Sequence, residues 1–167
     1  MAVSNVLRVL PEEAHRWLEH GYTYVDVRSE LEFEAARVPG ALNVPLQCVE
    51  GDRLVDNPEF SSVMSALFRT TDPLMIGCRS GARSHVAVQR LVEAGFVNLV
   101  ELARGFSGAR DEFGRRLPGW EQRGLPVERG QADGRGYSEL RTRAEAARAA
   151  GHAPALVSAL QVSPRRS

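Results

Sequence analysis

Short apolar runs alternate with helix-prone segments along the first hundred residues, and this alternation constrains the fold more than any other feature. Five runs rich in β-branched or aliphatic side chains predict strands at residues 7–9, 24–27, 42–44, 74–76 and 97–102. Strands that alternate with helices in this way pack as a mostly parallel sheet with helices on both faces. The sequence therefore predicts an α/β fold with a central five-stranded sheet and a single core.

Helix signals fill the gaps between these runs. Ser29 followed three residues later by Glu32 forms a capping box, and Asn57 caps a helix that is expected to reach about residue 68. After the last strand, one more helix is expected over residues 105–113. Residues 125–127 then close the domain.

The C-terminal part of the chain differs in composition from the rest. Residues 129–136 are rich in Gly and Arg and predict a linker, so we place one domain at residues 1–128 and an extension at residues 129–167. Residues 137–150 are helix-prone with a thin apolar stripe, which predicts either weak docking or mobility. The extension holds seven arginines and three acids, so it is either a solvated tail or a contact site for an acidic partner.

Composition limits the partners of the chain. Its formal net charge is zero and no apolar stretch approaches the roughly 18 residues that span a bilayer, so neither nucleic acid nor a membrane is expected as a partner. The first residues lack the pattern of a secretion signal, so we expect a cytoplasmic protein. Cys48 and Cys78 are not spaced as a metal-binding or redox pair, so neither a metal site nor a disulfide is expected.

The loop that begins at Cys78 carries the strongest chemical signal. An apolar strand leads into Cys78, Gly81 follows three residues later, and a helix is expected from Ser84. Backbone N–H groups in such a turn form an anion cradle, and the helix dipole adds positive potential. Arg79 and Arg83 supply fixed cations, so the loop favours a thiolate and an anionic substrate.

A buried structural cysteine is the plain alternative for Cys78, because most free cysteines are small core residues. Two arginines, a glycine and a helix start around the thiol make a reactive nucleophile the better interpretation. The predicted site is the nucleophile Cys78 together with a substrate-binding loop of Arg79, Ser80, Gly81, Ala82, Arg83 and Ser84.

This loop is one of several segments that share an ordered pattern with a known family. They are residues 24–28, 30–33, 38–45, 78–84, 105–106 and 124–127. In these segments and in their order, the chain resembles the single-domain rhodanese family over about residues 7–127. The resemblance implies a rhodanese-like fold and a thiosulfate sulfurtransferase that uses no metal or organic cofactor.

The resemblance also implies a two-step transfer on Cys78. The thiolate would attack the outer sulfur of thiosulfate or a similar donor, sulfite would leave, and the resulting persulfide would pass its sulfur to cyanide or a thiol. Phosphatases that share this fold use a C-x5-R loop, which forms a larger ring around phosphate. Only four residues separate Cys78 from Arg83, so sulfur transfer is the better interpretation.

Two residues outside the loop are expected to support it. Asp26 and Arg28 end the second predicted strand, at the edge where the sites of parallel sheets collect. Similarity to the family suggests that they brace the loop or its substrate. A structural ion pair with Glu32 or Glu34 is the equal alternative.

Other features leave the substrate and the function class open. Arg104 and Arg110 either add cations to the pocket rim or form surface ion pairs, and we favour the ion pairs. Cys48 is not expected to lie close enough to resolve a persulfide. The alternative function is a rhodanese-like binding or regulatory module, or a carrier fed by a protein persulfide donor. Such modules usually lose the cysteine, so the presence of Cys78 favours an enzyme.

Overall fold

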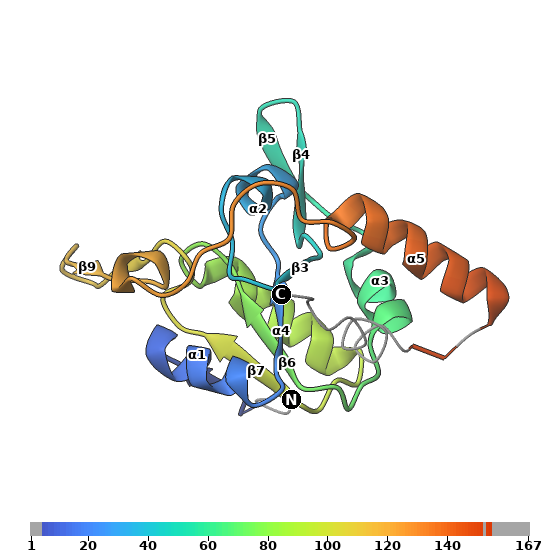
Figure 1. The fold of residues 1–167 in the computed structure, drawn as a ribbon, viewed down its shortest axis with the longest axis horizontal. Helices are drawn as coiled ribbons and strands as arrows, with labels where there is room; N and C mark the ends of the chain where they lie inside the picture. The colour runs from blue at the N-terminus through green and yellow to red at the C-terminus, as the bar shows by residue number, and fades with distance from the viewer. Residues whose placement is uncertain (1–4, 152, 155–167) are drawn as a thin grey trace, which may run out of the picture.

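The computed structural model describes residues 5–151 and 153–154, and its centre is a parallel five-stranded sheet (Figure 1). Every pair of neighbouring strands in this sheet is parallel, which confirms the predicted α/β class. Across the sheet the strands run in the order β1 (Leu7–Val9), β7 (Leu99–Leu102), β6 (Leu74–Gly77), β2 (Thr23–Asp26) and β3 (Leu42–Asn43).

Helices cover both faces of the sheet because successive strand residues point to opposite sides. Val25 and Ile76 pack on the face covered by the later helices, whereas Tyr24 and Met75 pack on the other face. The first face carries α3 (Phe60–Leu67), α4 (Ala82–Glu93) and α5 (Tyr137–Ala150). The second face carries α1 (Pro11–Glu19) and α2 (Glu30–Ala35). None of the helices in the described residues is long and apolar enough to span a membrane.

Two short hairpins project from this frame, and the sequence predicted neither. One consists of β4 (Gln47–Glu50) and β5 (Arg53–Asp56), the other of β8 (Ala109–Arg110) and β9 (Arg116–Leu117). In Figure 1 the first hairpin stands clear of the sheet, and its Val49, Leu54 and Val55 side chains are exposed. A strand exposed on both faces lacks the alternation of polar and apolar residues on which strand prediction depends.

The prediction of a helix over residues 105–113 is wrong. Gly105 and Gly108 instead take positive φ angles of 66° and 86°, a region that glycine enters without steric cost. A Cβ atom on Gly108 would lie 2.6 Å from the Leu117 carbonyl oxygen, so the hairpin needs glycine there. Phe113, the last residue of the predicted helix, is 73% exposed, so it does not contribute to the core.

The helix that begins at the Ser29 capping box, α2, ends at Ala35 because the chain then becomes extended and pairs with a distant segment. Arg37 and Glu128 exchange two backbone hydrogen bonds of 3.0 and 2.9 Å. The buried Arg37 guanidinium also donates to the Glu128 carboxylate at 2.9 Å and to the Phe33 carbonyl at 3.1 Å. The segment around residues 125–128 is thereby fastened across the end of α2.

The helix of the C-terminal extension packs into the main core. Its Tyr137, Leu140 and Ala144 side chains are buried with the residues of α3, and Figure 1 shows α5 alongside α3. Asn57 also donates a hydrogen bond of 3.1 Å to the Tyr137 hydroxyl. The predicted boundary at residue 128 stays a prediction, but within the described residues the helix shares its core with the sheet. Residues 155–167, the rest of the predicted extension, lie outside the described part of the chain.

Candidate active site

The predicted nucleophile lies at the carboxyl end of β6, next to the centre of the sheet. All four residues of β6 are buried, and Cys78 follows directly after its last residue, Gly77. A Cβ atom on Gly77 would collide with the Tyr24 hydroxyl group, so only glycine fits immediately before the cysteine. The β6 strand therefore fixes the position of the Cys78 thiol.

The loop encloses the sulfur atom rather than leaving it at an open mouth. Cys78 is only 1% exposed, and its Sγ accepts a hydrogen bond of 3.1 Å from the Gly81 backbone N–H. Gly81 has a φ of 109° and is the N-cap residue of the 12-residue helix α4. The positive end of that helix dipole therefore faces the sulfur, which stabilises negative charge there.

A buried carboxylate is connected to the thiol through a hydroxyl group. The Cys78 thiol lies 3.5 Å from Ser84 Oγ, and Ser84 Oγ donates to Glu101 Oε1 at 3.0 Å. Glu101 is 1% exposed in β7, and the cationic Arg8 side chain lies 3.3 Å from its other oxygen. Sequence reasoning missed Glu101, although an acid inside an otherwise apolar strand was a usable signal.

Arg83 points to a carboxylate instead of standing free in the loop. Its guanidinium donates two hydrogen bonds of 2.7 and 2.8 Å to the Glu32 carboxylate. Burial alone would raise the pKa of Glu32, but the hydrogen bonds from Arg83 and Ser29 outweigh it and lower that pKa to about 2. The pair ties α4 to α2 and neutralises much of the Arg83 charge. Whether Arg83 also binds substrate stays a prediction.

Asp26 and Arg28 pair with each other, and neither Glu32 nor Glu34 bonds to Arg28. The Arg28 guanidinium donates to Asp26 at 2.7 to 3.1 Å and lies 4.5 Å from the centre of the Phe106 ring. Burial opposes the charge of Arg28, yet the Asp26 carboxylate raises its pKa above the ordinary value. Because the Phe106 N–H donates to the Cys78 carbonyl at 2.8 Å, this pair supports a turn that braces the loop.

Arg79 is the loop cation that faces solvent. It lines a cavity of about 610 Å³ that also contains the Arg110 and Arg116 side chains. Among the described residues, none of these three arginines has a carboxylate partner within ion-pair distance, which is contrary to the surface pairing favoured for Arg110. Arg104 likewise lacks one there. The β8–β9 hairpin therefore adds positive charge beside the loop.

The remaining candidates lie apart from this chemistry. Cys48 is a half-buried free thiol in the β4–β5 hairpin, and burial raises its pKa above the ordinary value. Within the described residues, no three His, Cys, Asp or Glu side chains converge closely enough to hold a metal ion. The candidate site thus consists of the buried Cys78, the hydrogen-bonding loop of residues 78–84, and a basic rim formed by Arg79, Arg110 and Arg116.

Comparison with known proteins identifies the family to which the chain is similar. Residues 10–112 match the family model of the rhodanese-like domain. Thiosulfate sulfurtransferase 16, a chloroplastic protein of Arabidopsis thaliana, is 33% identical over 68% of this chain and 86% of its own length. Senescence-associated protein DIN1 of Raphanus sativus is 35% identical over 76% of this chain, which spans 64% of that protein.

A solved structure agrees with the fold. The crystal structure of Rv0390 from M. tuberculosis superposes with a TM-score of 0.62 at 27% identity, covering 76% of this chain and all of that one. Relatives named thiosulfate sulfurtransferases support a sulfurtransferase activity at the level of the family. On the match of residues 10–112 and on these similarities, the chain belongs to the family of rhodanese-like domains.

Proposed function

We propose that this protein transfers sulfane sulfur from thiosulfate, or from a similar anionic donor, through a persulfide on Cys78. One observation carries the proposal: the Cys78 sulfur receives the Gly81 N–H at 3.1 Å from the amino end of a 12-residue helix. Preorganised donors of this kind stabilise negative charge on the atom at which it develops.

The first step is a displacement at sulfur. The Cys78 thiolate attacks the outer sulfur of thiosulfate, a new S–S bond forms, and the bond to the sulfonate sulfur breaks, so that sulfite leaves with the bonding electron pair. Splitting a transfer into two displacements is the general advantage of covalent catalysis. Gly81 and the α4 dipole hold the anionic sulfur during this step.

The second step returns the enzyme to its starting state. Cyanide or a thiolate attacks the terminal sulfur of the persulfide, giving thiocyanate or a new persulfide, and the Cys78 thiolate leaves. No net oxidation or reduction of the protein occurs over the two steps. The acceptor, a protein persulfide donor and a cytoplasmic setting stay predictions.

The Ser84 hydroxyl connects the Cys78 sulfur to the buried Glu101 carboxylate. The thiol proton has a path of hydrogen bonds to Ser84 Oγ, which itself donates to the buried Glu101 carboxylate. When Cys78 is ionised, the Ser84 hydroxyl can rotate and donate to the sulfur instead. A hydroxyl carries one donor and two acceptor sites, so both arrangements are chemically allowed.

Donor capture is assigned to the basic rim rather than to Arg83. Arg79, Arg110 and Arg116 line one cavity beside the loop, whereas Arg83 is already held by two hydrogen bonds to Glu32. Unpaired arginines supply a field that concentrates small anions at the mouth of the site.

The test is the intact mass of the purified chain after incubation with thiosulfate. We expect a gain of about 32 Da, one sulfur atom, that cyanide removes. Cys78→Ser should show no gain, and Cys48→Ser, the matched control at the other free thiol, should gain like the wild type. A folded wild-type protein that gains no mass from thiosulfate or mercaptopyruvate would instead favour a non-catalytic module.

A further inference from the structure

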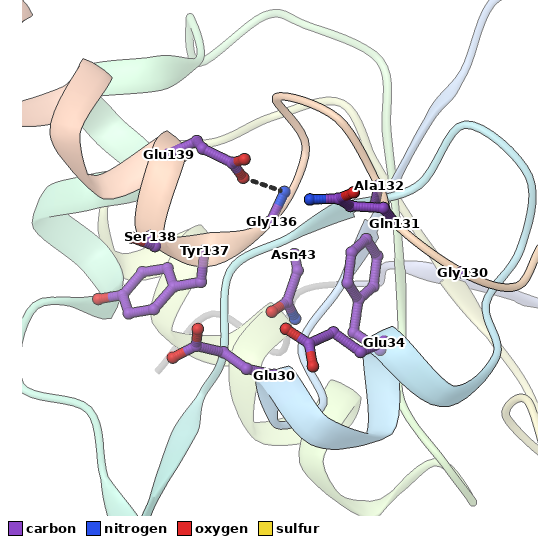
Figure 2. A pocket seen from close by; sticks show the side chains of 11 residues that line it. Glu30, Glu34, Asn43, Gly130, Gln131, Ala132, Gly136, Tyr137, Ser138 and Glu139 are labelled. Atoms are coloured by element: carbon purple, nitrogen blue, oxygen red, sulfur yellow. Dashed lines mark hydrogen bonds between the residues drawn. The ribbon is translucent and has the colours of Figure 1, made fainter.

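A second cavity lies away from the Cys78 loop, between the second helix and the amino end of α5 (Figure 2). We call it the α2–α5 pocket, and its volume is about 530 Å³. That volume falls within the range of pockets that bind small molecules. The side chains that matter below are Glu30, Phe33, Glu34, Asn43, Tyr137 and Glu139.

The floor of the pocket holds a buried amide with an unused acceptor. Asn43 is fully buried, and its Nδ2 donates to the Asp26 and Arg28 carbonyl oxygens at 3.0 and 2.9 Å. Only the nitrogen of an amide can donate to two carbonyls, so the side-chain orientation is determined. Among the described residues, the Oδ1 atom has no hydrogen-bond partner, and in Figure 2 the amide lies between the Glu30 and Glu34 side chains.

An unpartnered buried acceptor is unfavourable by about 1 to 3 kcal/mol, so a donor is expected in the pocket. A ligand with an N–H group would satisfy Asn43 Oδ1 directly. The pocket is separate from the catalytic loop in its lining, since none of its lining residues belongs to residues 78–84.

Carboxylates surround this acceptor, which determines the charge of the ligand. Glu30 and Glu34 lie one helical turn apart on α2, and Glu139 of α5 lines the opposite side of the pocket, where its carboxylate points toward the Gly136 N–H (Figure 2). Burial and the neighbouring Glu34 charge raise the pKa of Glu30 above its ordinary value. Such repulsion between carboxylates is relieved when a cation binds between them.

In the part of the chain that the structure describes, no basic side chain lines the pocket to neutralise these acids. Arg141 is close enough to Glu30 to influence its charge, but its guanidinium pairs with Glu59 at 3.1 Å and with Glu145 at 3.3 Å. One Glu139 oxygen accepts the Gly136 N–H at 3.1 Å. The pocket therefore keeps a net negative lining.

The walls favour an organic cation over a metal ion. Among the described residues, no three acidic, His or Cys side chains approach closely enough to coordinate a metal. Phe33 and Tyr137 line the same space and make part of its wall apolar, which suits an alkyl stem.

We propose that the α2–α5 pocket binds an organic cation, a guanidinium or ammonium group on a short alkyl chain. Its N–H donates to Asn43 Oδ1, its charge lies between Glu30 and Glu34, and its stem packs on Phe33 and Tyr137. The cation comes from a free amine metabolite or from a basic side chain of a partner protein, and both present the same chemistry.

Isothermal titration calorimetry of the full chain with agmatine at about 0.15 M salt tests the proposal, because exposed charges are screened at that ionic strength. We expect saturable one-to-one binding of agmatine, and weaker binding of 4-guanidinobutyrate, because its guanidinium is retained while its carboxylate is repelled by the acidic lining. Glu30→Gln and Glu34→Gln should each weaken agmatine binding about tenfold. Glu93→Gln, an exposed acid on α4, is the matched control and should bind like the wild type.

A short peptide with one arginine separates the two sources. Binding at least as tight as that of agmatine would point to a partner protein, and weaker binding to a free amine. Heats that do not saturate, or equal affinities in the wild type and both glutamine variants, would overturn the proposal and leave Asn43 to a water molecule. Thermal unfolding of each variant shows that it is folded, and the persulfide assay on the wild type tests the sulfur chemistry separately.

Discussion

The Cys78 loop and the α2–α5 pocket differ in charge and in how they are assembled, although both are in contact with the second helix, α2. Residues 78–84 are consecutive and form an anion cradle with a basic rim. The pocket combines residues from α2, β3 and α5, about 90 positions apart, and its lining is acidic. A site made of neighbouring residues has a local motif, whereas a site made by docking distant elements has none.

The second helix, α2, lies between the basic region around the Cys78 loop and the acidic α2–α5 pocket. Glu32 faces the loop and pairs with Arg83, while Glu30 and Glu34 face the pocket. Residues two positions apart on a helix do not share a face, so one short helix serves both sites. The following predictions test this division, from the largest expected effect to the smallest.

Replacement of the nucleophile should have the largest effect and should be confined to the loop. Cys78→Ser should lower sulfur transfer by at least about a thousandfold, because the covalent route is lost. Agmatine binding should be unchanged. Steady-state thiocyanate formation measures the loss, with Cys48→Ser as the control. Substantial activity in Cys78→Ser would remove the cysteine from the mechanism.

Truncation of a buried side chain on α5 should chiefly destabilise the region that contains the α2–α5 pocket. Leu140 is fully buried, so Leu140→Ala should lower the free energy of unfolding by about 3 kcal/mol. For a chain of this length, that corresponds to a decrease in Tm of about 6 to 12 °C. Differential scanning calorimetry measures it, and the exposed Thr142→Ala on the same helix is the control. No change in Tm would mean that α5 does not contribute to the core.

Loss of the solvent-facing loop cation should weaken donor capture. Arg79→Ala should raise the KM for thiosulfate about tenfold with a smaller change in kcat, since a charge that meets the free anion is removed. Arg115→Ala is the control, because Arg115 lies in the β8–β9 hairpin beside the loop but pairs with Asp111. A larger KM increase in Arg83→Ala than in Arg79→Ala would reassign the donor site to Arg83.

The Glu32–Arg83 ion pair should make a smaller, pH-dependent contribution. The pKa of Glu32 is lowered from 4.5 to about 2, so its contribution is present above pH 4.5 and is lost as the pH falls toward 2. Because Glu32 is partly exposed, Glu32→Gln should cost only about 1 kcal/mol at pH 7. Urea unfolding at pH 7 and at pH 3 measures this, with Glu93→Gln as the control. An equal cost at both pH values would exclude the ion pair as its source.

Much of the fold was predictable because its signals are short in range. The five strands, the Ser29 capping box and the glycine-containing loop after Cys78 all depend on residues within a few positions of one another. The hairpin at residues 109–117 was missed because residues 105–113 were assigned to a helix, which the positive φ angles of Gly105 and Gly108 exclude. The β4–β5 hairpin was missed because neither of its faces is fully buried.

By itself, the sequence determined the α/β class and the placement of Cys78 between a buried strand and a helix, because strand, loop and helix follow one another directly. The helix begins at Ala82, two residues before the predicted start at Ser84. Only the tertiary structure decided that Arg83 pairs with Glu32, that Glu101 reaches Ser84, and that Asn43 has an unpartnered oxygen. The Arg83–Glu32 and Ser84–Glu101 contacts join residues 51 and 17 positions apart. The pocket around Asn43 forms only because α5, which is far along the chain, packs beside α2. The partner of a long polar side chain is set by which elements pack together, and that arrangement has no local signal in the sequence.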